Sequence, residues 1–339
     1  MVLAAGGWPA AATGDRLGKN IVICCDGTNS QFGGVETNVA HLFHRLAADS
    51  SEQRKRYEPG VGTFGANIFS VNVGRTLGKL LGAAFGYGLK QNLDNAYRYV
   101  VDCYAPGDRL FIFGFSRGAF TARSLASLVD QYGVLDRRDG DRVPEQVAAY
   151  LADAPPVRAG CRAPVGRCAP HFVGVWETVG ALGLLLRLRR FKHNRLSPGV
   201  ARAAQALAVD EQRRCFAPTR WDESALGSEQ CVRQVWFAGV HADVGGGYVD
   251  RGLARITLDW MLEQAVAAGL RLNPESRTGP AGDPAGALHQ SYRGLWRLLG
   301  RHVRRIAADA DIHASVNRRR VLCRDYDPAN LARARPPTG

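Results

Sequence analysis

Short, mostly apolar runs alternate along the chain with longer segments in which apolar residues recur every three or four positions. The runs are typical of strands buried on both faces of a sheet, and they are Ile21–Cys25, Leu110–Phe113, Phe172–Trp176 and Gln234–Val240. Helical periodicity is found in Thr37–Ala48, Leu89–Tyr104, the segment after Arg117, Val200–Phe216, Gly252–Ala268 and residues 290–308. Strands that alternate with helices predict an α/β fold with a mostly parallel sheet and helices on both faces.

One apolar stretch does not fit this alternation. Residues 72–88 carry glycines throughout, and each interior glycine costs a helix about 0.5–1 kcal/mol relative to alanine. This composition favours a cap or lid that lines an apolar channel, and equally a buried irregular segment. We therefore expect a flexible lead over residues 1–19 and a single domain over residues 20–339, with cap segments near residues 66–88 and 136–200.

A candidate nucleophile lies between a strand and a helix. The strand Leu110–Phe113 runs into the sequence GFSRG at residues 114–118. G-x-S-x-G between a strand and a helix is typical of a nucleophile elbow, in which a sharp turn exposes the serine, here Ser116. Gly114 and Gly118 would leave room where strand and helix pass closely. The alternative is a glycine-flanked turn whose serine caps the helix.

A serine nucleophile requires a base that accepts its proton and an acid that orients the base. In hydrolases with an elbow serine, the chain order is serine, acid, histidine, each after a strand. Ser116, Glu177 and His241 follow predicted strands in that order. Asp243 is an alternative acid because it lies two residues from His241. A helix-capping role for Glu177 and a structural role for His241 in the core are the competing interpretations.

The loop after the first strand, CCDGTN, has two interpretations. In elbow hydrolases such a loop supplies one backbone donor to the oxyanion, and the residue after the serine supplies the other. We therefore expect the oxyanion hole to consist of the N–H of Arg117 and that of Gly27 or Thr28. The other interpretation is a magnesium-dependent phosphatase, but Cys24 occupies the position where such an enzyme has its nucleophilic aspartate.

Composition limits the kinds of binding partner and the cellular compartment that we expect for the protein. The net charge of +13 over 339 residues indicates either affinity for anionic surfaces or only the solubility of a protein from an arginine-rich proteome, and the second interpretation is slightly favoured. The apolar-then-basic segment LLLRLRRFK at residues 184–192 could lie on a membrane surface or form an ordinary surface helix. No nucleic-acid-binding motif is recognisable, and no run suits a signal peptide or a membrane span. The eight cysteines include no C-x-x-C pair and no zinc spacing, which favours a reducing, cytoplasmic location without a metal site.

Six motifs together resemble the DUF2235 α/β-hydrolase family, which includes the type VI secretion phospholipase effectors of the Tle1 group. They are CDGTN, YEPGVGTFG, GFSRGAFTAR, FVGVWETVGALG, LSPGVARAAQALAVDEQRRCFAP and VWFAGVHADVGGGY, and weaker similarity continues to Leu331. The resemblance implies an α/β-hydrolase core with a catalytic triad of nucleophile Ser116, acid Glu177 and base His241. The family usually has aspartate where this chain has Glu177, which gives Asp243 some weight as the acid.

These observations predict a serine hydrolase that cleaves acyl esters, with phospholipids among the expected substrates. The mechanism would proceed through an acyl-enzyme and would need no cofactor. The alternative is a catalytically weak lipid- or anion-binding protein on the same scaffold. Peripheral contact with an anionic membrane is expected, a nucleic-acid partner is not, and export by a partner system is left open.

Overall fold

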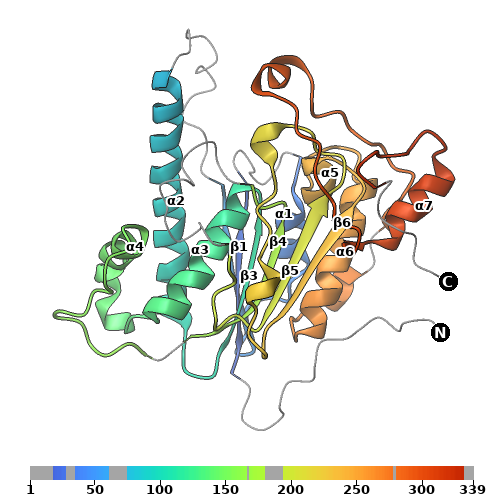
Figure 1. Ribbon diagram of the computed structural model, residues 1–339. Helices are drawn as coiled ribbons and strands as arrows, with labels where there is room; N and C mark the ends of the chain where they lie inside the picture. Colours follow the sequence, from blue (N-terminus) through green and yellow to red (C-terminus); the bar gives the residue numbers. More distant parts are fainter. Residues whose placement is uncertain are drawn as a thin grey trace.

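The structure is a computed structural model, which describes residues 18–27, 35–60, 75–165, 168–179, 194–277 and 280–331 (Figure 1). Its centre is one sheet of seven strands in the order β2-β1-β3-β4-β5-β6-β7, and every neighbouring pair is parallel. The strands are β1 (Asn20–Cys25), β2 (Gln53–Glu58), β3 (Arg109–Phe115), β4 (Pro170–Trp176), β5 (Arg202–Ala208), β6 (Cys231–Phe237) and β7 (Asp311–Ile312).

Helices cover both faces of this sheet (Figure 1). The described helices are α1 (Asn38–Arg45), α2 (Arg75–Cys103), α3 (Arg117–Tyr132), α4 (Val143–Leu151), α5 (His241–Gly245), α6 (Gly252–Ala267) and α7 (Ala314–Leu322). Helices α2, α3 and α4 pack on one face, and α1 and α6 pack on the other. The predicted α/β architecture, with a parallel sheet and helices on both faces, is confirmed.

The side chains of β1 explain why its sequence is continuously apolar. Ile21, Ile23 and Cys25 point into the core beneath α2 and α3, whereas Val22 and Cys24 point into the core beneath α1 and α6. All five side chains are fully buried. A strand with helices on both faces has no solvent-facing position, so hydrophobic burial favours apolar residues throughout.

The strand order creates a crevice at one edge of the sheet. The chain leaves β1 toward α1 on one face and leaves β3 toward α3 on the other. In doubly wound sheets, ligands bind where neighbouring strands diverge in this way, outside the carboxyl ends of the strands. Gly27, Ser116, Glu177 and His241 all follow strands at this edge.

Two elements differ from the expectation. Val200–Phe216 is not a helix: it contains the strand β5, followed by a short 3-10 turn at Arg214–Phe216. β5 lies between β4 and β6 and is buried from its second residue onward, so tertiary packing overrides the helix propensity of its alanines. The strand β2 was not expected, because it is an edge strand without an apolar run: its sequence is QRKRYE, and only the first and last residues are buried.

The glycine-containing stretch also differs. Residues 75–88 have helical backbone and extend α2 at its N-terminal end. Extending an existing helix costs less than nucleating one, so the glycine penalty does not stop it. Residues 66–74 and 184–192 lie outside the described residues, so a cap or membrane role for them stays a prediction. Residues 1–17 of the lead expected over residues 1–19 also lie outside the described residues.

The C-terminal part is less helical than expected. Within residues 290–308 the structure has only a 3-10 helix, Gly294–Leu299, whereas α7 was not expected. No helix in the described ranges is long and apolar enough to cross a membrane. All eight cysteines are free thiols.

Candidate active site

Ser116 occupies a sharp turn between β3 and α3. Its backbone torsions, φ 56° and ψ −117°, are unfavourable for a residue other than glycine. A Cβ on Gly114 would collide with the carbonyl of Gly118, and a Cβ on Gly118 would collide with the carbonyl of Cys25. The Ser116 hydroxyl makes no capping hydrogen bond to α3. The turn therefore has the geometry of a nucleophile elbow.

His241 lies at the start of α5 with its ring over this turn. Its Nε2 is 2.9 Å from the Ser116 Oγ. The ring is enclosed by Phe115 and Phe216, with centroid distances of 4.7 Å and 4.8 Å. These contacts leave His241 buried and fix the plane of its imidazole.

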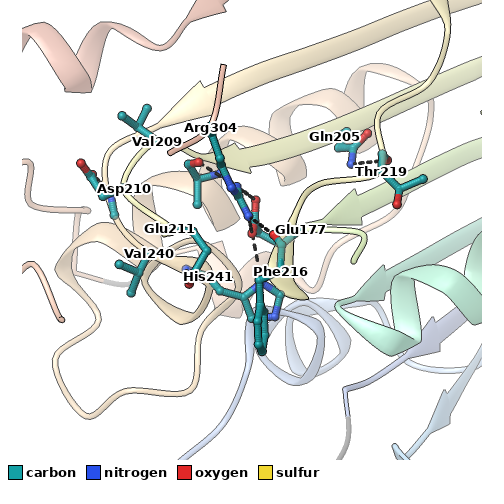
Figure 2. Close-up of polar contacts among 12 residues, drawn as sticks. Glu177, Gln205, Val209, Asp210, Glu211, Phe216, Thr219, Val240, His241 and Arg304 are labelled. Carbon is teal, nitrogen blue, oxygen red and sulfur yellow. Dashed lines mark hydrogen bonds and ion pairs between the residues drawn. The ribbon is translucent and has the colours of Figure 1, made fainter. Parts of the chain in front are cut away.

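Glu177 follows β4 and is fully buried behind the histidine (Figure 2). Its Oε2 lies 3.0 Å from His241 Nδ1, and its Oε1 accepts a 2.7 Å hydrogen bond from the Ala208 N–H. Arg304 donates to both oxygens, at 2.7 Å and 2.8 Å. The structure thus brings the serine, histidine and glutamate into one hydrogen-bonded chain.

The surroundings of Glu177 and His241 determine the charge that each side chain carries. Burial alone would raise the pKa of Glu177, but the Arg304 guanidinium and the hydrogen bond with His241 hold that pKa well below its usual range. Burial lowers the pKa of His241, and Glu177 opposes this shift in part. A neutral imidazole that donates from Nδ1 to a carboxylate has its Nε2 lone pair free to accept the serine proton.

Asp243 has different partners. Its Oδ1 lies 2.6 Å from His289 Nδ1, and its Oδ2 accepts a 3.0 Å hydrogen bond from the Val240 N–H. These contacts fix the loop before α5. The structure therefore brings Glu177, and not Asp243, to the ring of His241.

The candidate oxyanion donors differ in their availability. The Arg117 N–H is the first of α3, and the first N–H groups of a helix have no partner within it. The Gly27 N–H donates to Asp26 Oδ1 at 2.6 Å, so it is engaged in this structure. Thr28 lies outside the described residues.

Asp26 is buried and serves this loop as an acceptor. Besides the Gly27 amide, it accepts hydrogen bonds from the hydroxyls of Thr37 and Tyr57, at 2.7 Å and 2.5 Å. These hydrogen bonds show that Asp26 stabilises the loop beside Ser116. In the part of the chain that the structure describes, no group of His, Cys, Asp and Glu side chains is arranged to hold a metal ion.

Two residues near the site were not predicted from the sequence to belong to it. Arg304 lies 127 positions from Glu177, in a segment without a motif. Glu211 is buried and accepts hydrogen bonds from the His241 N–H, the Ser291 hydroxyl and Arg213. Glu211 lies in the motif LSPGVARAAQALAVDEQRRCFAP and follows β5 at the same edge, but the helix predicted over Val200–Phe216 did not place it at the end of a strand.

Comparison with known proteins gives one family and several similar chains. The family described as "T6SS, Phospholipase effector Tle1-like, catalytic domain" matches residues 19–264. Uncharacterized protein YEL023C of Saccharomyces cerevisiae is 32% identical over 227 aligned residues, and the match covers 59% of this chain and 33% of that protein. The chain thus spans about a third of the length of this curated relative.

Two solved structures are similar at lower identity. The crystal structure of an uncharacterized protein from Pseudomonas aeruginosa is 20% identical, with a TM-score of 0.44, over 77% of this chain and 48% of that one. The Tle1 effector bound to the VgrG spike of the type 6 secretion system is 19% identical, with a TM-score of 0.34, over 69% of this chain and 52% of that one. Because the family match covers well over half of the sequence and includes Ser116, Glu177 and His241, the chain belongs to the family of Tle1-like phospholipase effector catalytic domains.

Proposed function

We propose that the protein is a serine hydrolase that cleaves the acyl esters of phospholipids with the triad Ser116, His241 and Glu177. Membership in a family of phospholipase catalytic domains supports a lipase-type hydrolase. The observation that carries the proposal is the pair of contacts at 2.9 Å and 3.0 Å that link hydroxyl, imidazole and carboxylate.

In the proposed first half-reaction, the Ser116 Oγ attacks the acyl carbonyl while His241 Nε2 takes the hydroxyl proton. Glu177 stabilises the imidazolium that forms. The Arg117 N–H, at the positive end of α3, donates to the oxyanion. We retain Thr28 as the second donor, because the Gly27 amide is engaged with Asp26.

The tetrahedral intermediate then collapses. His241 returns its proton to the alcohol that leaves, which is the lysophospholipid, and the acyl group stays on Ser116. A water molecule, deprotonated by the same histidine, attacks this ester and releases the fatty acid. Every proton is carried by one imidazole, so no metal or cofactor is required.

Release of fatty acid from phospholipid vesicles tests this function. We expect activity from the wild type, none from Ser116→Ala, and near wild-type activity from the control Ser127→Ala. Ser127 lies on the same helix, α3, and its hydroxyl contacts Gln131. Equal release by wild type and Ser116→Ala would refute the proposal and favour the lipid-binding alternative.

A further inference from the structure

A buried arginine from the C-terminal segment contacts the candidate acid. Arg304 is 2% exposed, and its two terminal nitrogens donate four hydrogen bonds of 2.7–2.8 Å (Figure 2). Two of these go to the Glu177 oxygens, and the others go to the carbonyls of Ala208 and Phe216. One side chain thereby joins the ends of β4 and β5 to the turn whose phenyl ring encloses His241.

Such a contact has two physical consequences. A bidentate guanidinium fixes both the position and the rotation of a carboxylate. Its charge also offsets part of the negative field that the carboxylate exerts on the imidazole, and burial strengthens that effect. The other charged groups that act on His241 are Glu211 and Arg213, which pair with each other at 2.9 Å.

We propose that Arg304 is a positioning residue of the triad, which aligns Glu177 with His241 and limits the basicity of the imidazole. This inference rests on the proposed function. Arg304 lies beyond residues 19–264, which the family description covers. It would therefore be a contribution of this chain's C-terminal segment to the site.

The test compares three variants by kcat/KM on a soluble ester as a function of pH. Arg304→Met should lower kcat/KM by up to roughly 100-fold, because a catalytic group misplaced by about 1 Å can cost about that factor in rate. The plot of kcat/KM against pH falls on its acid side, and this acid limb should move to higher pH in Arg304→Met. The reason is that loss of the cation raises the proton affinity of the Glu177–His241 pair. Arg304→Lys keeps the charge, so its rate should fall while its acid limb stays in place.

Arg319→Met is the matched control. Arg319 is also buried, and it donates to the carbonyls of Pro284 and Gly286, both at 2.7 Å, away from the triad. It should reduce thermal stability without moving the acid limb. Should Arg304→Met fail to fold, Arg304→Ala with added guanidinium ion replaces it, and partial recovery of rate is expected.

Two outcomes are distinguishable from failure of the proposed function. If the wild type hydrolyses the ester and the folded Arg304 variants keep its rate and its acid limb, the role of Arg304 is refuted alone. If guanidinium ion restores nothing to a folded Arg304→Ala, the same conclusion holds. If the wild type itself does not hydrolyse esters, the proposed function fails first.

A second and independent observation concerns the exposed surface of residues 293–305. Leu298 is 80% exposed, and Trp296, Leu299 and Val303 are 37%, 45% and 45% exposed. The arginines at 293, 297, 301 and 305 are exposed among them, and residues 284–308 contain no acidic side chain. This segment, here called the 293–305 segment, forms the projection beside α5 in Figure 1.

The 293–305 segment is close to the triad. The Trp296 ring packs on Phe216 with a centroid distance of 5.5 Å, and Phe216 packs on His241 at 4.8 Å. Exposed Trp and Leu next to Arg suit the boundary of a membrane, where apolar side chains enter the acyl region and guanidinium groups meet phosphates. The four exposed arginines give the segment a positive charge that no acidic residue within it offsets. A neutral or basic partner would not complement this charge, whereas anionic lipid does.

We propose that the 293–305 segment docks the protein on an anionic phospholipid surface. The test measures co-sedimentation of Ser116→Ala protein, which avoids hydrolysis, with vesicles of phosphatidylcholine alone or mixed with phosphatidylglycerol. Binding should require phosphatidylglycerol, and Leu298→Glu should weaken it roughly tenfold or more. Val321→Glu is the matched control, because Val321 is also 80% exposed but lies on α7.

Arg297→Glu should likewise weaken binding, whereas Arg318→Glu on α7 should have a smaller effect. Equal binding by Leu298→Glu and Val321→Glu would overturn the proposal. So would a concentration-dependent dimer that Leu298→Glu abolishes, because a second copy of the chain would then cover the segment. Neither outcome depends on whether Ser116 is catalytic.

Discussion

Ser116 and Glu177 both have left-handed backbone torsions, with φ of 56° and 50°, although neither is glycine. Each such conformation costs about 1–3 kcal/mol and persists only where the surroundings impose it. Here β3 and α3 impose it on the serine, and on the glutamate the end of β4 and a 3.0 Å hydrogen bond from the Glu177 N–H to the Ala206 carbonyl hold the backbone. Both strained residues face the same imidazole, so the strain serves the alignment of one hydrogen-bonded chain.

At this scale the choice of acid can be tested directly. Glu177→Gln keeps the shape of the side chain but removes the charge that fixes the histidine tautomer, and the equivalent change in serine proteases costs about 10⁴ in kcat. We expect a loss of roughly 10³–10⁴-fold for this variant. Asp243→Asn is the control and should lose far less, because Asp243 contacts His289. A larger loss in Asp243→Asn than in Glu177→Gln would show that the acid is Asp243 and that the assignment of Glu177 is wrong.

The pH dependence of the rate follows from the state of His241. Burial lowers the pKa of its imidazole below the usual value of 6.5. A base with a lowered pKa stays neutral as the pH falls through 6.5 and takes up its proton only at lower pH. We therefore expect kcat/KM on a soluble ester to stay constant to below pH 6.5 and to decline only in more acid solution. A decline that begins above that pH would be inconsistent with the buried imidazole.

Among the elements, the strand–turn–helix unit of β3 and α3 depends most on its glycines. A Cβ on Gly118 would overlap the carbonyls of Cys25 and Asp26, which belong to rigid backbone at the end of β1. α3 could relieve this overlap only by moving away from β1, which would displace Ser116. The elbow therefore couples packing of the helix to the position of the hydroxyl.

Gly118→Ala should lower the free energy of unfolding by about 1–3 kcal/mol, the usual cost of overpacking, and should reduce ester hydrolysis as well. Gly227→Ala is the matched control, because a Cβ there would meet only the flexible Gln230 side chain at 3.7 Å. Thermal unfolding followed by circular dichroism measures the difference. Equal midpoints for the two variants would show that the helix tolerates the extra methyl group.

The elements that could be predicted from the sequence are those that local residue patterns determine. β1, β3, β4, β6 and α6 follow apolar runs or helical periodicity, and the elbow follows a motif with its own steric rule. β5 was misassigned because its alanines favour a helix in isolation, and only burial between two strands makes it extended. The contacts of Arg304 with Glu177 and of Glu211 with His241 could not be predicted, since they join distant segments of the chain.

On the scale of the whole molecule, the part beyond the family match completes the core. Residues after 264 supply β7, α7 and Arg304, and Tyr326 donates a 2.9 Å hydrogen bond to the partly buried Asp210. Val316, Tyr326 and Leu331 form a further apolar cluster with β5 and β6. The site and the fold thus both depend on the C-terminal segment.

A chain ended after residue 264 would leave Glu177 as a buried carboxylate without its guanidinium partner and would expose the edge of β6. We expect it to be aggregated or unfolded under conditions in which the full chain is soluble and folded. Solubility and thermal unfolding of the truncated and the full chain measure this. A folded, active protein ended after residue 264 would contradict the dependence on the C-terminal segment.

The most direct test of the central claim is the site and rate of modification by a fluorophosphonate probe, because only an activated serine reacts quickly. Mass spectrometry of the labelled protein should place one adduct on Ser116. His241→Ala, which removes the base 2.9 Å away, should slow the labelling at least about a hundredfold. An adduct on another residue, or equally fast labelling of Ser116 without His241, would contradict the proposed triad.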